Sequence, residues 1–268
     1  MPDRTYRLVV RAATTLFAAL GLRIDVQGSE HLPRHGPAVL ASNHVGFLDF
    51  LFVGLVGTEQ GRLVRFLAKE GSFRPPVVGG AMRAMGHVPV DRGHGEVALR
   101  HAVGLARRGE VVGLFPEATI SHAWTLRPFR PGAAATAAWS GAPLVPVVVW
   151  GSQRVLSVRG RWARRRGIAV SVLVGEPLHP GPSDDPVEVT AELRARMEDL
   201  LAVAMDRYPD EARGDRDRWW LPAARGGTAP TPEEGARLDE EGMRRVDDAS
   251  AARAAHRRAR AVRRQARR

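Results

Sequence analysis

The sequence predicts an α/β fold in which a mixed, largely parallel sheet is flanked by helices. Short β-rich runs alternate with helical runs between residues 23 and 174, which is the pattern of a sheet covered on both faces. The run 144–149 is purely apolar, as is typical of a central strand buried on both sides. At 268 residues, of which 44% are hydrophobic, the chain is long enough to bury one sizeable core.

The individual elements follow from residue spacing. Residues 6–20 place apolar side chains at helical intervals behind Arg4, Arg7 and Arg11, which predicts an N-terminal amphipathic helix. A Pro/Asp loop at 180–186 precedes the last expected helix, whose apolar stripe would pack on the sheet. Between these helices we expect strands at 23–26, 38–42, 64–68, 87–90, 111–115, 144–150 and 168–174, and helices at 48–56, 77–85 and 96–107.

Composition divides the chain into an N-terminal helix at 1–22, a central domain at 23–220 and an Arg/Ala-rich tail at 221–268. The tail has few large apolar groups, so we expect it to be largely disordered apart from a helix between 249 and 268. The formal net charge is +11, and eight arginines without an acidic residue fall between 249 and 268, which leaves only +3 on the rest. Because no aromatic side chains alternate with these arginines and no nucleic-acid module is recognisable, no nucleic-acid partner is expected.

Several classes of protein are excluded by composition. The absence of cysteine rules out disulfides, thiolate nucleophiles and cysteine-ligated metals. The scattered histidines have no metal-ligand spacing, so no metal site is expected. The uncharged run at 12–22 has 11 residues, against the roughly 20 apolar residues that cross a bilayer, and no cleavable signal follows it. We therefore expect a cytoplasmic protein that rests on a membrane surface.

The segment 41–50 carries the most informative chemistry. A strand that ends in Ser-Asn-His places His44 at the carboxyl end of the sheet, where open α/β folds bind their ligands. Asp49, early in the next helix, can return to the imidazole, fix its tautomer and stabilise its charged form. No serine or cysteine accompanies the pair as a nucleophile, so the nucleophile would belong to the substrate. A histidine and an aspartate at this spacing also occur as an ordinary surface pair.

Three later segments add candidate binding groups. Residues 86–93 form a strand that leads to Arg92, a planar donor suited to phosphate. Residues 115–119 end another strand with the carboxylate of Glu117 and the hydroxyl of Thr119, which suit the hydroxyls of a small polyol. Residues 142–147 enter a buried strand.

In this order, the four segments closely resemble the motifs of the glycerolipid acyltransferase family, the 1-acyl-glycerol-3-phosphate (lysophosphatidate) acyltransferases and their relatives. The resemblance covers about residues 22–177. It implies an acyltransferase domain in which His44 is the general base and Asp49 orients it. It also implies that Arg92 and Glu117 bind the glycerol phosphate. Two more residues are expected to contact substrate: Thr119, and Arg130 in the basic segment that follows.

The third motif departs from the family pattern. Ala118 stands where the family usually has glycine, and Ile120 replaces the next polar residue. Alanine disfavours the positive φ that glycine adopts readily, and isoleucine removes a potential donor. We therefore expect the acceptor site to differ from that of the standard lysophosphatidate enzyme.

The resemblance implies transfer of an acyl group from acyl-CoA or acyl carrier protein to the hydroxyl of a lysophospholipid, foremost 1-acyl-glycerol-3-phosphate, giving phosphatidic acid. The thioester is a co-substrate, and no cofactor or metal is expected. Another lysophospholipid or a glycolipid is the alternative acceptor, and a non-enzymatic basic adaptor on membranes or nucleic acid is the alternative class. The expected location is peripheral, on the inner face of the cell membrane, with 6–20 and 77–85 facing lipid.

Overall fold

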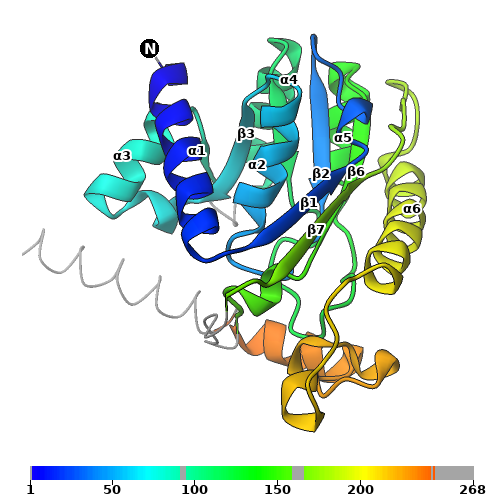
Figure 1. Cartoon of the computed structure of the whole chain (residues 1–268). Helices are drawn as coiled ribbons and strands as arrows, with labels where there is room; N and C mark the ends of the chain where they lie inside the picture. Colours follow the sequence, from blue (N-terminus) through cyan, green and yellow to red (C-terminus); the bar gives the residue numbers. More distant parts are fainter. Residues whose placement is uncertain (1, 91–94, 159–165, 243, 245–268) are drawn as a thin grey trace, which may run out of the picture.

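The computed structural model describes residues 2–90, 95–158, 166–242 and 244, and its centre is a seven-stranded sheet (Figure 1). The strand order is β1-β7-β6-β2-β5-β3-β4. The strands are β1 (Arg23–Gln27), β2 (Ala38–Ser42), β3 (Val64–Lys69), β4 (Val88–Val90), β5 (Val111–Leu114), β6 (Leu144–Trp150) and β7 (Ala169–Val174). The helices are α1 (Pro2–Ala19), α2 (Asp49–Glu59), α3 (Pro76–Ala84), α4 (Gly95–Arg107), α5 (Gly132–Ser140) and α6 (Pro186–Asp206).

The sheet is mixed and largely parallel, which confirms the predicted fold class. β2 lies in the middle, in parallel with β6 on one side and β5 on the other. β3 continues the parallel arrangement next to β5, as do β4 next to β3 and β1 next to β7. Of these seven strands, only β6 and β7 pair antiparallel. The carboxyl ends of β2, β3, β4 and β5 therefore meet at one edge of the sheet.

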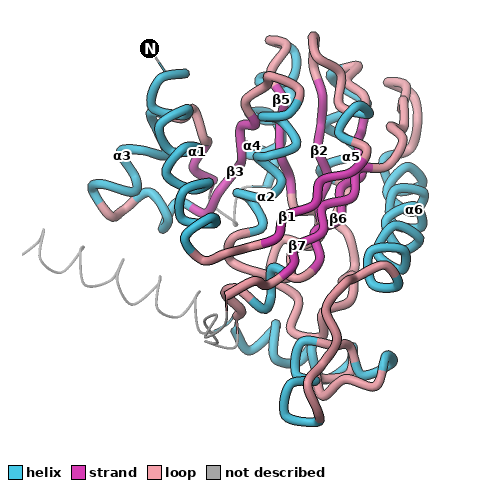
Figure 2. Tube along the Cα trace, viewed as in Figure 1, coloured by secondary structure: helices cyan, strands magenta, loops and turns pink. Residues whose placement is uncertain are grey.

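Helices cover both faces of the sheet (Figure 2). α1 and α2 pack on one face, whereas α4, α5 and α6 pack on the other. Successive β2 side chains alternate between the two apolar cores: Val39 and Ala41 face the α4–α6 side, and Ala38 and Leu40 face the α1–α2 side. All five β2 residues are buried, which explains why this strand reads as an uninterrupted small and apolar run.

Most expected elements appear within a few residues of their predicted limits. The difference at the N-terminus is larger, because α1 begins at Pro2 rather than near residue 6. Tyr6 accounts for the early start: its side chain is 4% exposed and its hydroxyl donates to the carbonyl of Val64 at 3.0 Å. The N-terminal part of α1 is thus fastened to β3. Within the described residues, no helix combines the length and hydropathy needed to cross a bilayer.

The first part of the tail is more ordered than its composition predicts. The short helical turn η5 (Ala223–Arg225) is followed by a helix at residues 232–242, drawn in orange at the bottom of Figure 1. A few specific contacts hold this segment, because Ala229 and Asp239 are buried although the segment as a whole is polar. Residues 243 and 245–268, which include the run of eight arginines, lie outside the described residues.

Candidate active site

His44 follows β2 directly, and the preceding residue fixes where the chain leaves the sheet. The side-chain amide of Asn43 donates to the carbonyl of Val149 at 3.0 Å and accepts from the N–H of Val149 at 2.7 Å. These two bonds extend the contact between β2 and β6 by one residue, although the backbone of β2 has already turned away. Asn43 is fully buried, so its hydrogen bonds hold the backbone immediately before His44 in place.

The structure brings His44 and Asp49 within hydrogen-bond distance, as their spacing predicts. His44 Nδ1 lies 2.9 Å from Asp49 Oδ2, and the Asp49 side chain is fully buried. The same oxygen accepts from the backbone N–H groups of Val45 at 2.7 Å and Gly46 at 2.8 Å. A carboxylate is an acceptor, so Nδ1 carries the ring proton and the lone pair is left on Nε2. With 19% of its side chain exposed, His44 remains accessible.

The second oxygen of Asp49 has a partner that no sequence motif indicated. Ser152, in the turn η3 (Ser152–Arg154) after β6, donates its hydroxyl to Asp49 Oδ1. Ser152 is fully buried. A Cβ on Gly46 would lie 2.8 Å from Ser152 Oγ, so glycine at position 46 allows the two segments to approach this closely. Both oxygens of Asp49 are therefore held by hydrogen bonds other than the one to the imidazole.

The loop after β5 holds the peptide groups of His44. His44 N–H donates to Glu117 Oε1 at 2.8 Å, and the carbonyl of His44 accepts from the N–H of Ser121 at 2.8 Å. Glu117 Oε2 accepts from the N–H of Arg127 at 3.0 Å. Burial raises the pKa of Glu117 to about 8, and the backbone N–H groups of Arg127 and His44 oppose that rise. Glu117 thus lies beside His44, and both of its carboxylate oxygens accept from backbone N–H groups.

The other residues expected to bind substrate are distributed unevenly around this loop. Thr119 is half-buried, two residues beyond Glu117. The Arg130 side chain is exposed, and the backbone N–H of Arg130 donates to the carbonyl of Pro116 at 3.0 Å. Arg92 lies outside the described residues; β4 ends two residues before it, at the same edge as His44. In the described part of the chain, no group of three or more histidine, aspartate or glutamate side chains could hold a metal ion.

The departure at Ala118 does not prevent the turn that glycine would favour. Ala118 adopts φ = 60°, in the left-handed region. Ile120 is 7% exposed and so occupies an apolar position rather than facing a ligand. Ala118 thus adopts the left-handed backbone, and the expected difference in the acceptor site stays a prediction.

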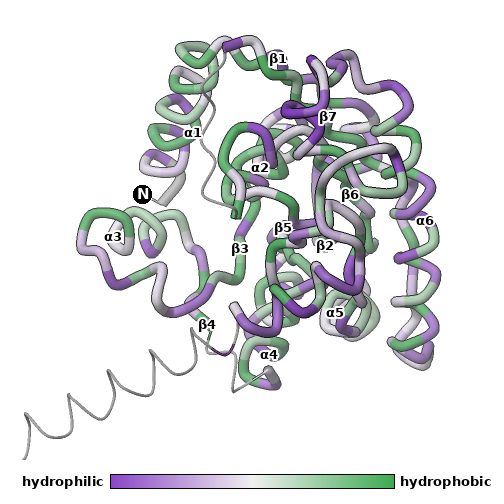
Figure 3. Tube along the Cα trace, turned by 90° about the horizontal axis from the view of Figure 1, so that it is seen from below, coloured by the Kyte–Doolittle hydropathy of each residue, from purple (hydrophilic) through white to green (hydrophobic). Residues whose placement is uncertain are grey.

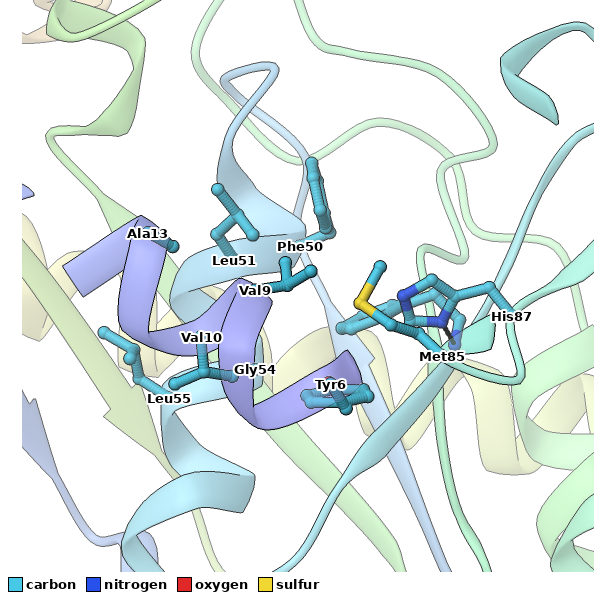
Figure 4. A pocket seen from close by; sticks show the side chains of 11 residues that line it. Tyr6, Val9, Val10, Ala13, Phe50, Leu51, Gly54, Leu55, Met85 and His87 are labelled. Atoms are coloured by element: carbon cyan, nitrogen blue, oxygen red, sulfur yellow. Dashed lines mark hydrogen bonds between the residues drawn. The ribbon is translucent and has the colours of Figure 1, made fainter. Parts of the chain in front are cut away.

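Aromatic rings connect the site to an apolar cavity. The His44 ring stacks on Phe115 with 4.3 Å between centroids, and Phe115 stacks on Phe66 at 6.1 Å. Phe66 lines a small pocket of about 30 Å³ together with residues of α1, α2 and the end of α3, including Val9, Gly54 and Met85 (Figure 4).

Comparisons with known proteins agree with the sequence motifs. The acyltransferase family model matches residues 23–150. A 1-acyl-sn-glycerol-3-phosphate acyltransferase of Bacillus subtilis is 30% identical over 62% of this chain and 80% of that protein. The chloroplastic 1-acyl-sn-glycerol-3-phosphate acyltransferase BAT2 of Brassica napus is 32% identical over 68% of this chain. The chain spans about half the length of the plant relatives, 54% of BAT2 and 45% of LPAT1 of Arabidopsis thaliana.

A solved structure shares the fold. The crystal structure of the 1-acyl-sn-glycerophosphate acyltransferase PlsC from Thermotoga maritima superposes with a TM-score of 0.66. The two chains are 22% identical, and the match covers 78% of this chain and 83% of that one. The likeness at this level of identity is one of fold.

Proposed function

The chain belongs to the acyltransferase family that includes the 1-acyl-sn-glycerol-3-phosphate acyltransferases, and we propose that it acylates a lysophospholipid. The acyl group would come from acyl-CoA or acyl carrier protein. The favoured acceptor is 1-acyl-glycerol-3-phosphate, and the product is then phosphatidic acid. The observation that supports this proposal best is the His44–Asp49 pair, whose free nitrogen Nε2 stands at the carboxyl edge of the sheet, inside the region that matches the family.

The proposed chemistry is direct transfer. His44 Nε2 takes the proton of the acceptor hydroxyl while the hydroxyl oxygen attacks the thioester carbonyl carbon. The carbon–sulfur bond then breaks, and the imidazolium returns the proton to the leaving thiolate. Asp49 holds the ring and stabilises its positive charge, because its buried carboxylate lies against Nδ1. General-base assistance of this kind contributes about 10²–10⁴-fold, and alignment of the two substrates supplies further acceleration.

We propose that Arg92 binds the phosphate of the acceptor and that Glu117, Thr119 and Arg130 border the glycerol. The parallel sheet supports this arrangement, since the carboxyl ends of β2, β4 and β5 lie at one edge. Glu117 would act mainly through the loop, because both of its oxygens accept from backbone N–H groups. Ile120 favours an acceptor with fewer polar contacts in the third motif, which keeps other lysophospholipids and glycolipids as alternatives.

The test of the activity is an acceptor panel with one acyl-CoA, read by mass spectrometry. We expect lysophosphatidate to be acylated, and His44→Ala to abolish the product while leaving the fold intact by circular dichroism. His101→Ala is the matched control, because His101 is exposed on α4. Retained turnover in His44→Ala would refute the assignment of the base. Product from a different lysolipid alone would keep the reaction class and change the acceptor.

We also propose that the face formed by α1 and α3 rests on the inner surface of the cell membrane. The two helices lie side by side (Figure 1), and apolar and polar residues alternate along them (Figure 3). Val77 is 83% exposed, Val78 53% and Leu8 67%, which is unusual for side chains of this type. The exposed arginines of α1 add attraction to anionic lipid: Arg4, Arg7 and Arg11.

Flotation with anionic liposomes tests this surface. The double substitution Val77→Asp and Val78→Asp should reduce the bound fraction several-fold, because it places two charges in the apolar contact. Val187→Asp is the control, since Val187 is 65% exposed on α6, away from α1 and α3. Equal binding of both variants and the wild type would refute the proposed contact.

A further inference from the structure

The helix at residues 232–242 lies directly on the loop that carries Glu117. We refer to this loop, between β5 and α5, as the 115–131 loop. A Cβ on Gly235 would lie 2.9 Å from the Cβ of Ala123, so glycine allows the helix to approach the loop closely. Asp239 follows four residues later, on the same side of the helix. It is 3% exposed, which is rare for a carboxylate unless partners compensate it.

Asp239 has two partners, and both belong to the 115–131 loop. Its Oδ1 lies 2.5 Å from His122 Nδ1, and its Oδ2 lies 2.6 Å from Arg127 Nε. Their side chains are mostly buried, at 18% and 17% exposed. Charge-assisted hydrogen bonds in such surroundings are among the stronger polar contacts in proteins. Asp239 therefore joins two points of the loop that are five residues apart in the sequence.

Each of these two points is next to a contact that holds His44. His122 adjoins Ser121, whose N–H donates to the carbonyl of His44 at 2.8 Å. Arg127 donates its N–H to Glu117 Oε2 at 3.0 Å and its Nη1 to the carbonyl of Glu117 at 3.2 Å. Glu117 in turn accepts from the N–H of His44 at 2.8 Å. Two contacts, through His122 and Ser121, thus link Asp239 to the carbonyl of His44, and three contacts, through Arg127 and Glu117, link it to the N–H of His44.

We propose that Asp239 is a positioning residue for His44, acting through the 115–131 loop. The helix at 232–242 holds the loop against the backbone of His44. Asp239 sets the relative positions of Ser121 and Glu117, the two loop residues that bond to the peptide groups of His44. The effect on turnover rests on the proposed acyl transfer, whereas the effect on the loop does not. Asp239 also lies outside residues 23–150, the region matched by the family model, so this contribution comes from a separate part of the chain.

Asp239→Asn is the decisive substitution, because it removes the charge with little change of shape. A displacement of about 1 Å in a reacting group costs on the order of 10²-fold in rate. We expect kcat to fall about 10–100-fold while KM for the thioester and for the acceptor changes less than about threefold. The matched control is Glu240→Gln, the neighbouring carboxylate, which is exposed and should leave kcat within about twofold.

Hydrogen–deuterium exchange of the peptide that contains His44 gives a measurement independent of activity. In Asp239→Asn the amide of His44 should exchange at least about tenfold faster than in the wild type, and in Glu240→Gln at the wild-type rate. Should Asp239→Asn fail to fold, Gly235→Ala tests the same contact by pushing the helix away from Ala123, with faster exchange and lower kcat expected.

The outcomes separate the two proposals. Faster exchange at His44 together with a fall in kcat supports the positioning role. Unchanged exchange, or a loss confined to KM, overturns it. If the wild type acylates no acceptor in the panel, the proposed function fails, and the exchange measurement still decides whether Asp239 holds the loop.

Discussion

Replacing Ala118 by glycine should stabilise the protein, because Ala118 has φ = 60° in the loop after β5. A side chain with a Cβ costs about 1–2 kcal/mol in the left-handed region. Glycine removes that cost and loses about 0.5–1 kcal/mol through the greater freedom of the unfolded chain. The expected net gain is about 0.5–1 kcal/mol, or about 1–4 °C in Tm for a protein of this size.

A thermal unfolding series can measure this gain against a control of opposite sign. Ala191→Gly makes the same chemical change at an exposed position inside α6, where the backbone is an ordinary right-handed helix. That substitution should cost about 1 kcal/mol and lower Tm. The two substitutions are chemically identical and fall in opposite backbone conformations, so their Tm values should move apart. A lower Tm for Ala118→Gly than for the wild type, with Ala191→Gly also lowered, would refute the reasoning.

Three further substitutions test the contacts around the base. Glu117→Gln should flatten the pH dependence of stability. The pKa of the Glu117 carboxyl is raised from 4.5 to about 8 in the folded protein, so the free energy of unfolding of the wild type falls as the pH rises between these two values. Relative to the variant, the wild type should lose up to about 1.4 kcal/mol per pH unit in denaturant unfolding, and parallel pH profiles would contradict this. Asn43→Ala should cost about 2–5 kcal/mol, since it leaves the buried N–H and C=O of Val149 unpaired, and a cost below about 1 kcal/mol would contradict the role of that side chain. Ser152→Ala should cost about 1–3 kcal/mol in unfolding free energy by leaving Asp49 Oδ1 without its hydroxyl donor, and an unchanged midpoint would show that the bond contributes nothing.

Local sequence patterns were sufficient to predict the sheet, its flanking helices and the approach of Asp49 to His44. The strands and helices follow from the short repeat of apolar residues along the chain. The contact between His44 and Asp49 follows from a spacing of five residues at the point where a strand leads into a helix. The order of strands in the sheet and the second oxygen contact of Asp49 did not follow from such patterns. Ser152 meets Asp49 across 103 residues of sequence, and only the pairing of β2 with β6 brings the two together.

The helix at 232–242 is a different case, because a local signal for it was present. Thr231 and Glu234 form a capping box: the N–H of Thr231 donates to Glu234 Oε2 at 3.0 Å, and the N–H of Glu234 donates to Thr231 Oγ1 at 3.3 Å. Pro232 stands at the first helical position, which also favours a helix start. The polar composition of the tail outweighed this signal in the prediction. The buried carboxylate of Asp239 and the close packing of Gly235 on Ala123 attach a helix that has few apolar side chains.

The central place of β2 has a consequence for how the protein acquires its chemistry during folding. The contacts that orient His44 join residues 103 and 106 positions apart, so closing them requires long loops of chain to be ordered first. Contacts of such high sequence separation form slowly compared with local helices. A partly folded chain with its helices formed and its sheet incomplete therefore carries no oriented imidazole. His44 is held against Asp49 only after the middle of the sheet has assembled.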